Sequence, residues 1–171
     1  MTAVSLKKIL SDANKNKYAV AGLVVLAWDD ALAFTKAADE TGVPIILQAG
    51  PSCRAHTPVP ILGKMFRYLA AQTKTHVCCH IDHGYTVREC VEGIDSGFTS
   101  VMFDGSKLSL IENIKVTSRI VKKAQIAKVS VEGEIGFVGY NQGAESLSTN
   151  PIEAKKFAEQ TGCDAMAISA G

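Results

Sequence analysis

Short apolar runs and amphipathic stretches alternate along almost the whole of this chain. The apolar runs have no polar face, which is typical of strands buried in a parallel sheet. Between them, apolar residues recur at helical spacing, as Leu6, Ile9, Leu10 and Ala13 do near the N-terminus. The pattern predicts six strands, at residues 18–26, 43–47, 76–81, 99–103, 129–134 and 165–169. We expect the first of them, residues 18–26, to be buried on both faces.

Capping and stop residues mark the boundaries of the helices between these strands. Thr86 with Glu89 and Ser109 with Glu112 have the spacing of a capping box. Asn150, directly before a proline, is a further N-cap signal. We expect the helices between the strands to end near Gly42, Gly97, Lys123 and Gly162.

Repeated strand-plus-helix units indicate an α/β protein with a parallel sheet, either doubly wound or closed into a barrel. No glycine-rich dinucleotide-binding loop follows the first strand, which weakens the doubly wound alternative. Polar residues gather after strands three, four and five, a pattern typical of the active face of a (β/α)8 TIM barrel. A complete barrel takes about 250 residues. We therefore expect residues 1–171 to form a single incomplete barrel domain with about the first six βα units.

The composition and net charge bear on which kinds of partner the protein binds. The chain is 47% hydrophobic and 20% charged, with a formal net charge of +1, as in ordinary soluble globular proteins. This charge gives no reason to expect a nucleic acid or an anionic membrane as partner. The N-terminus has no signal-peptide pattern, and the longest apolar run, residues 19–27, is too short to span a bilayer. We expect a cytoplasmic protein whose five scattered cysteines are reduced packing residues.

Three short motifs carry most of the candidate chemistry, and each follows an expected strand. They are HIDHG at residues 80–84, DGS at 104–106 and EGEIG at 132–136. Because parallel strands end at one edge of a sheet, we expect Asp82, His83, Asp104 and Glu134 to converge there. A histidine and carboxylates brought together in this way can hold a divalent metal or move protons.

Strand periodicity constrains how these side chains point. Residues two apart share a face, so His80 and Asp82 point together. His83 reaches the same site only if the strand has ended and Gly84 lets the chain turn. His80 is expected to be a satisfied interior histidine rather than a ligand. We assign no role to His56 or His76.

Two of the carboxylates also have simpler structural explanations. Asp104 is alternatively a helix-approach or turn residue, because Asp-Gly-Ser is common turn chemistry. Glu134 is alternatively a buried carboxylate paired with a base on a neighbouring strand.

Several of these segments together resemble the class II, zinc-dependent ketose-bisphosphate aldolases, the fructose-bisphosphate and tagatose-bisphosphate enzymes. They are residues 80–84, 97–106 and 112–114, in that order. VEGEIG at residues 131–136 is similar to the family's V-E-x-E-L-G segment, and residues 149–157 and 161–167 look like its next helix and strand. The resemblance covers nearly the whole chain. It implies a TIM barrel and a reversible aldol cleavage that gives dihydroxyacetone phosphate and an aldehyde.

The resemblance also implies roles for individual residues. Asp82 matches the acid/base aspartate that serves the C4 hydroxyl of the substrate, and His83 matches one of three histidines that hold the catalytic zinc. Asp104 and Glu134 match carboxylates that bind a second or alternative metal position. The family's zinc polarises the carbonyl of dihydroxyacetone phosphate. The family further implies a phosphorylated sugar as substrate, a place in glycolysis or related carbohydrate metabolism, and a homo-oligomer, either a dimer or a tetramer.

The chain departs from the family at both ends of the pattern. Val24 stands at the position of a substrate-contacting asparagine, and Gly50 stands near a family serine or threonine, with Ser52 as a candidate substrate-binding replacement. The family also continues past Gly171 with its other two zinc histidines and a glycine-rich phosphate loop. We therefore expect the 171-residue chain to be inactive on its own.

Two other functions remain open. One is a non-catalytic aldolase-like paralogue or fragment used for association or ligand binding. The other is a barrel metalloenzyme of different chemistry, such as a lyase acting on an unphosphorylated sugar acid.

Overall fold

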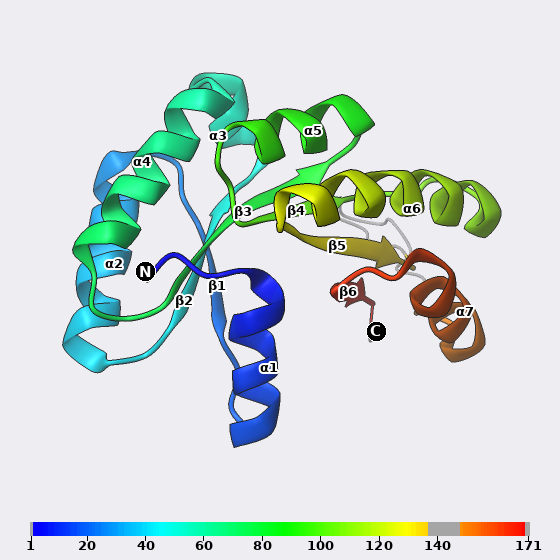
Figure 1. Ribbon diagram of the computed structural model, residues 1–171, viewed down its shortest axis with the longest axis horizontal. Coiled ribbons are helices and arrows are strands. Elements are labelled where there is room, and N and C mark those ends of the chain that lie inside the picture. Colours follow the sequence, from blue (N-terminus) through cyan, green and yellow to red (C-terminus); the bar gives the residue numbers. More distant parts are fainter. Residues whose placement is uncertain (1, 137–147, 170–171) are drawn as a thin grey trace, which may run out of the picture.

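Six parallel strands form one curved sheet whose strand order follows the sequence (Figure 1). The computed structural model describes residues 2–136 and 148–169. Each strand pairs in parallel with the next one along the chain. The strands are β1 (Ala21–Val24), β2 (Ile45–Ala49), β3 (Val77–Gly84), β4 (Ser100–Phe103), β5 (Ser130–Ile135) and β6 (Ala165–Ile168). The expected parallel α/β architecture is confirmed.

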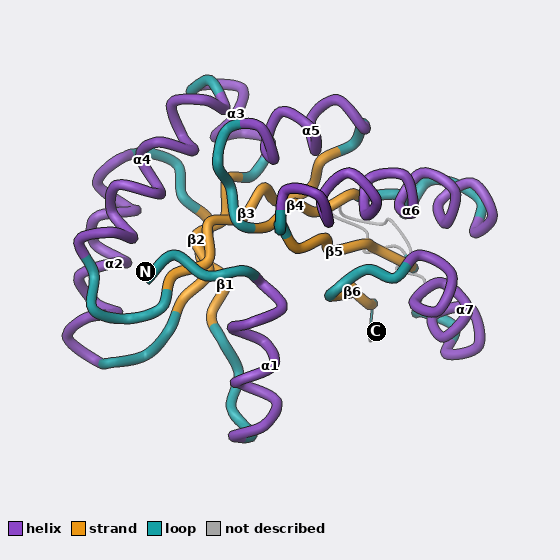
Figure 2. Tube along the Cα trace, in the orientation of Figure 1, coloured by secondary structure: helices purple, strands orange, loops and turns teal. Residues whose placement is uncertain are grey.

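Helices connect successive strands and cover the convex side of the sheet (Figure 2). They are α1 (Leu6–Asn16), α2 (Trp28–Thr41), α3 (Pro51–His56), α4 (Val59–Gln72), α5 (Val87–Asp95), α6 (Leu110–Ala127) and α7 (Pro151–Thr161). Helix α1 is the exception, because it lies on the concave side of the sheet. There Leu6 and Ile9 pack with Ile46 and Cys78, and Ala165 packs against this cluster.

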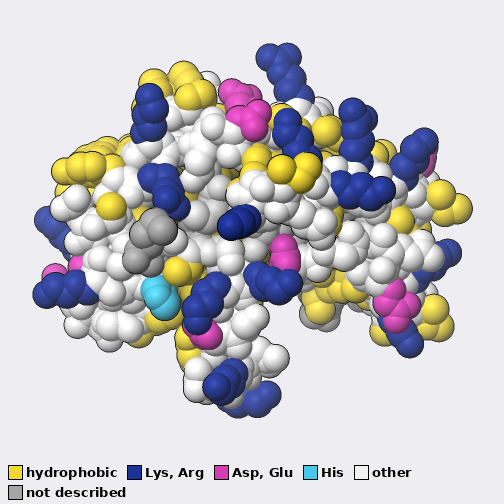
Figure 3. Space-filling model, viewed as in Figure 1, with side chains coloured by type: hydrophobic (Ala, Val, Ile, Leu, Met, Phe, Trp, Pro, Cys, Tyr) yellow, Lys and Arg dark blue, Asp and Glu magenta, His cyan; other side chains and the backbone are white. Residues whose placement is uncertain are grey.

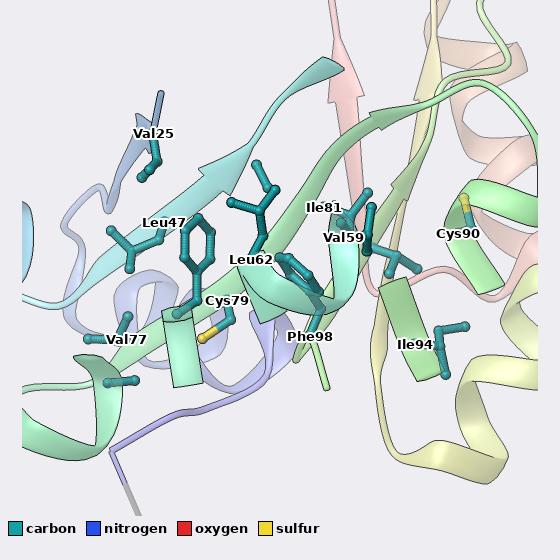
Figure 4. Close-up of a cluster of buried hydrophobic side chains, with 14 of the residues drawn as sticks. Val25, Leu47, Val59, Leu62, Val77, Cys79, Ile81, Cys90, Ile94 and Phe98 are labelled. Atoms are coloured by element: carbon teal, nitrogen blue, oxygen red, sulfur yellow. The ribbon is translucent and has the colours of Figure 1, made fainter. Parts of the chain in front are cut away.

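The hydrophobic core lies between the sheet and the outer helices. Side chains alternate along β3, so Cys79 and Ile81 face the helices while Cys78 faces the concave side. Leu62 of α4 and Phe98 are fully buried on the helix side (Figure 4). The concave side, in contrast, carries polar side chains toward the C-terminal ends of the strands.

All six expected strands are present, with ends shifted by a few residues, but one expectation about them is wrong. We expected residues 18–26 to be buried on both faces, whereas β1 covers only Ala21–Val24 and is mostly exposed. Val24 is 53% exposed. Within the described residues β1 pairs only with β2, so its other edge has no strand partner there.

Two helical features also differ from the expectation. Helix α6 runs past Lys123 to Ala127 and ends where Lys128 takes a left-handed conformation. Ala124 is buried, so packing extends the helix beyond its expected end. The short helix α3 was not expected, because six residues carry too little periodicity to be recognised.

The cysteines are packing residues, as the sequence predicted. All five cysteines are free, and all but Cys163 are buried. Figure 3 shows lysine and arginine side chains dispersed over one face rather than gathered into a single patch. Among the helices of the described ranges, none is long and apolar enough to cross a bilayer.

Candidate metal and acid/base site

A histidine and two carboxylates meet where β3, β4 and β5 end. One ligand atom from each of His83, Asp104 and Glu134 lies within 4.8 Å of the other two. His83 Nδ1 is 2.9 Å from Asp104 Oδ2 and 3.6 Å from Glu134 Oε2. The structure therefore brings together the three residues predicted as metal ligands.

A bulge in β3 turns His83 toward this cluster. Ile81 pairs with Val101 and Gly84 with Phe103, so β3 uses one residue more than β4 between the two pairs. His83 itself has a φ of 49°, in the left-handed region. For a residue other than glycine this costs on the order of 1 kcal/mol.

The expected route for this reorientation was wrong, because β3 does not end before His83 and the positive φ is not at Gly84. Gly84 is needed for close packing instead. A Cβ added there would lie 2.8 Å from the carbonyl oxygen of Met102 and 2.9 Å from Cys90 Sγ. Strand β3 can approach β4 and α5 this closely only without a side chain at this position.

Asp82 lies beside the cluster on the concave side of β3. It is buried, and Gln48 Nε2 donates a hydrogen bond of 3.1 Å to its Oδ1. Burial raises the pKa of Asp82, although the nearby charges of His83 and Arg54 oppose this. A carboxyl group with a raised pKa next to potential metal ligands is suited to general acid/base work.

Asp104 has both of the roles considered from the sequence. Its Oδ1 accepts hydrogen bonds from the backbone N–H of Ser106 at 3.1 Å and from Ser106 Oγ at 2.6 Å, which is turn chemistry. Its Oδ2 faces His83. Burial alone would raise the pKa of Asp104, but the hydrogen bonds from His83 and Ser106 outweigh it and the pKa is lowered. The same hydrogen bond to Asp104 raises the pKa of His83.

Glu134 is the member of the cluster with the fewest hydrogen bonds to its side chain within the described residues. Its side chain is 8% exposed, and its Oε2 has no hydrogen-bond partner among the described residues. Burial and the charge of Asp104 raise its pKa to about 7. Asn113 Nδ2 holds the backbone carbonyl of Glu134 at 2.8 Å, which fixes the end of β5.

A second polar pair lies deeper on the concave side. His80 Nδ1 is 2.9 Å from Ser100 Oγ, and its Nε2 is 3.4 Å from Glu132 Oε2. Burial lowers the pKa of His80 to about 3 and raises that of Glu132 to about 7. His80 is thus an interior histidine, as expected, but the prediction that it is satisfied was wrong, because its Nε2 makes no hydrogen bond within the described residues.

A cavity of about 210 Å³ opens onto the cluster. Its lining comes from five strands: Gln48, Asp82, His83, Met102, Glu132, Glu134, Ala167 and Ile168. Ser52, predicted to bind substrate, is exposed on α3 and does not line this cavity. Its role stays a prediction.

Sequence reasoning missed two residues that support the site. Gln48 sits on the concave face of β2 and holds Asp82. Arg54 on α3 donates hydrogen bonds to the backbone carbonyls of Ala49, Asp82 and His83. Gln48 was recognisable as a polar residue directly after the expected strand 43–47, but Arg54 carried no signal because its helix was not expected.

The donor set suits a divalent metal. Zn²⁺ binds histidine nitrogen and carboxylate oxygen at about 2.0–2.1 Å, so two tetrahedral ligands lie roughly 3.3 Å apart. The distances of 2.9 and 3.6 Å from His83 Nδ1 bracket this value. Glu134 Oε2 supplies an independent reason, because it accepts no hydrogen bond from the described residues and a cation would satisfy it.

Comparison with known proteins identifies the family of this chain. Residues 4–171 match the family model of class II fructose-bisphosphate aldolases, and the chain belongs to this family. It is 33% identical over 175 residues to a fructose-bisphosphate aldolase of Giardia intestinalis, aligned over 100% of this chain and 54% of that protein. A fructose-bisphosphate aldolase of Staphylococcus epidermidis is also 33% identical, over 180 residues and 62% of its length.

A solved structure gives the same result. The crystal structure of the YdjI aldolase from Escherichia coli superposes with a TM-score of 0.88 at 28% identity, covering 98% of this chain and 62% of that one. The curved sheet is therefore part of a TIM barrel, as the sequence predicted. The chain spans about 54% to 62% of the length of these proteins.

Proposed function

We propose that this site belongs to a zinc-dependent aldolase that reversibly cleaves a phosphorylated ketose into dihydroxyacetone phosphate and an aldehyde. Membership of the class II aldolase family supports the reaction class. The main support for a metal is Glu134 Oε2, a buried carboxylate oxygen that accepts no hydrogen bond from the described residues and lies close to both His83 and Asp104. We propose a cytoplasmic homo-oligomer in carbohydrate metabolism as its setting.

The proposed roles follow from what each side chain touches. His83, Asp104 and Glu134 would hold Zn²⁺ at one position or at two neighbouring positions, and the ion supplies Lewis-acid polarisation of the substrate carbonyl. Asp82 would take and return the proton of the substrate hydroxyl, because its raised pKa and its place in the cavity suit an acid/base group. Gln48 would hold Asp82 in place through the hydrogen bond to its Oδ1.

The activity of the 171-residue chain alone is a separate question. The family resemblance gives the catalytic zinc three histidines, of which His83 is one, and the phosphate loop lies in a further segment. We propose that the isolated chain binds metal but turns substrate over poorly.

The test is aldol cleavage of fructose bisphosphate by the natural gene product, followed through release of dihydroxyacetone phosphate with and without zinc. We expect zinc-dependent cleavage, and Asp82→Asn should reduce it by about 10²- to 10⁴-fold while zinc stays bound. Asp29→Asn, at an exposed position of α2, is the matched control and should leave activity unchanged. A zinc-loaded natural product that cleaves no phosphorylated ketose would contradict the proposal.

A non-catalytic aldolase-like protein is the second candidate, and one observation favours it. Val24 stands where the family resemblance places a substrate-contacting asparagine, and Gly50 stands near a family serine or threonine. Loss of these polar contacts disfavours binding of a polar sugar phosphate more than it disfavours association. Metal binding without cleavage by the natural product would support this candidate.

A further inference from the structure

Arg54 is a buried arginine whose guanidinium group donates hydrogen bonds to backbone carbonyls. Its side chain is 6% exposed. One terminal nitrogen donates to the carbonyls of both Ala49 and Asp82, and the other donates to that of His83 at 2.9 Å. The three carbonyls come from the ends of β2 and β3, so a single side chain ties the two strand ends together at the site.

The bulge in β3 explains why these carbonyls need a partner. Where β3 carries an extra residue, the regular pairing with β4 is interrupted between Ile81 and Gly84. The carbonyls of Asp82 and His83 belong to this interrupted stretch. A planar guanidinium with five N–H donors can bind several of them at once, which the ammonium group of a lysine does not reproduce.

Arg54 is itself held in place from α5. Its Nη2 lies 3.7 Å from Glu89 Oε1. The other oxygen of Glu89 accepts hydrogen bonds from the backbone N–H of Tyr85 at 3.0 Å and from Thr86 Oγ1 at 2.8 Å, at the start of α5. The capping carboxylate of α5 therefore also anchors the arginine that binds the bulge.

We propose that Arg54 is a positioning residue for the metal site, which holds His83 in its left-handed conformation so that its ring faces Asp104 and Glu134. This inference rests on the proposed metal site. Arg54 reaches the cluster through the backbone carbonyls of Asp82 and His83 and contributes no ligand atom to it. Without it, the metal affinity should fall although all three ligand side chains remain.

The experiment is a Co²⁺ titration of the 171-residue chain and its variants, followed by the visible d–d absorption of the bound ion. Arg54→Lys keeps the charge but loses the fork of donors. We expect about tenfold weaker Co²⁺ binding or more, the range found when groups that orient metal ligands are removed, with an altered absorption band. Arg88→Lys, at an exposed position of α5, should stay within twofold of wild type.

The outcomes separate the possible failures. Arg54→Lys protein that unfolds at a lower temperature, yet binds Co²⁺ with the wild-type affinity and spectrum, would show a purely structural role and overturn the inference. Absence of Co²⁺ uptake by the wild type would instead remove the proposed metal site, and the role of Arg54 with it.

If Arg54→Lys does not fold, Glu89→Gln decides, because glutamine still serves the helix cap but not the ion pair. Weaker Co²⁺ binding by the folded Glu89→Gln protein supports the inference, and unchanged binding contradicts it.

Discussion

Glu134 shows how a single residue is kept for its chemistry at a cost in stability. Its carboxyl group is buried and its pKa is raised to about 7 from an ordinary value of 4.5. Between these pH values the folded state binds more protons at Glu134 than the unfolded state does. The free energy of unfolding therefore falls as the pH rises from about 4.5 to 7, because the buried carboxyl group loses its proton over this range.

Replacement of Glu134 by glutamine should stabilise the metal-free protein above neutral pH. We expect Glu134→Gln to raise the free energy of unfolding at pH 8 by on the order of 1–3 kcal/mol, because the charged form no longer has to be buried. At pH 5, where the wild-type carboxyl is already protonated in the folded state, the difference should shrink. Urea unfolding at both pH values measures this.

Glu159→Gln, at an exposed position of α7, is the control and should show no such pH dependence. An equal effect of Glu134→Gln at pH 5 and pH 8 would show that burial of the charged carboxylate is not what limits stability.

Metal binding should become stronger as the pH rises, whereas the stability of the metal-free protein falls. Both His83 and Glu134 have raised pKa values, and both must be deprotonated to bind a cation. We expect the affinity for Zn²⁺ to fall by at least tenfold between pH 7.5 and pH 6, with proton release on binding. Calorimetric titration in buffers of different ionisation enthalpy measures both quantities, and pH-independent binding would contradict the assignment of these ligands.

At the scale of the element, the bulge in β3 decides whether the site exists. Sequence periodicity predicted that β3, β4 and β5 would end together and that Asp82, Asp104 and Glu134 would meet. It did not predict the bulge, because the rule of alternating faces assumes a regular strand. It also missed α3, so the contacts of Arg54 to the end of β3 were unpredictable from the chain alone.

Gly84 tests the packing that this bulge needs. An added Cβ would lie 2.8 Å from the Met102 carbonyl oxygen, so Gly84→Ala should lower the free energy of unfolding by about 1–3 kcal/mol. Gly50→Ala is a matched control, since its Cβ would lie 3.5 Å from Asp82 Oδ2, an ordinary contact. Urea unfolding of both variants gives the comparison, and equal losses of stability would contradict the close approach of β3 to β4.

At the scale of the whole molecule, the open sheet leaves two strand edges without partners in the described part of the chain. The fold class was predictable because alternating buried strands and capped helices allow few architectures. Exposure at the edges was less predictable, since an apolar run such as residues 18–26 reads as buried whether or not a neighbour covers it. Ile168, in β6, is 58% exposed at the opposite edge from β1.

These edges should make the isolated chain associate with itself. We expect concentration-dependent association in sedimentation velocity, reduced by Leu26→Lys next to β1. Ile126→Lys is the control, because Ile126 is 87% exposed but lies on α6, away from both edges. A chain that stays monomeric at all concentrations would contradict this prediction.

Zinc content tests the central claim most directly. The purified 171-residue chain, dialysed against dilute Zn²⁺ and then against metal-free buffer at pH 8, would be analysed by metal mass spectrometry beside His83→Ala and Glu134→Gln. Our account predicts about one zinc per wild-type chain and nearly none in either variant. Zinc-free wild type, or variants that retain the ion, would show that these residues do not form the metal site of this chain.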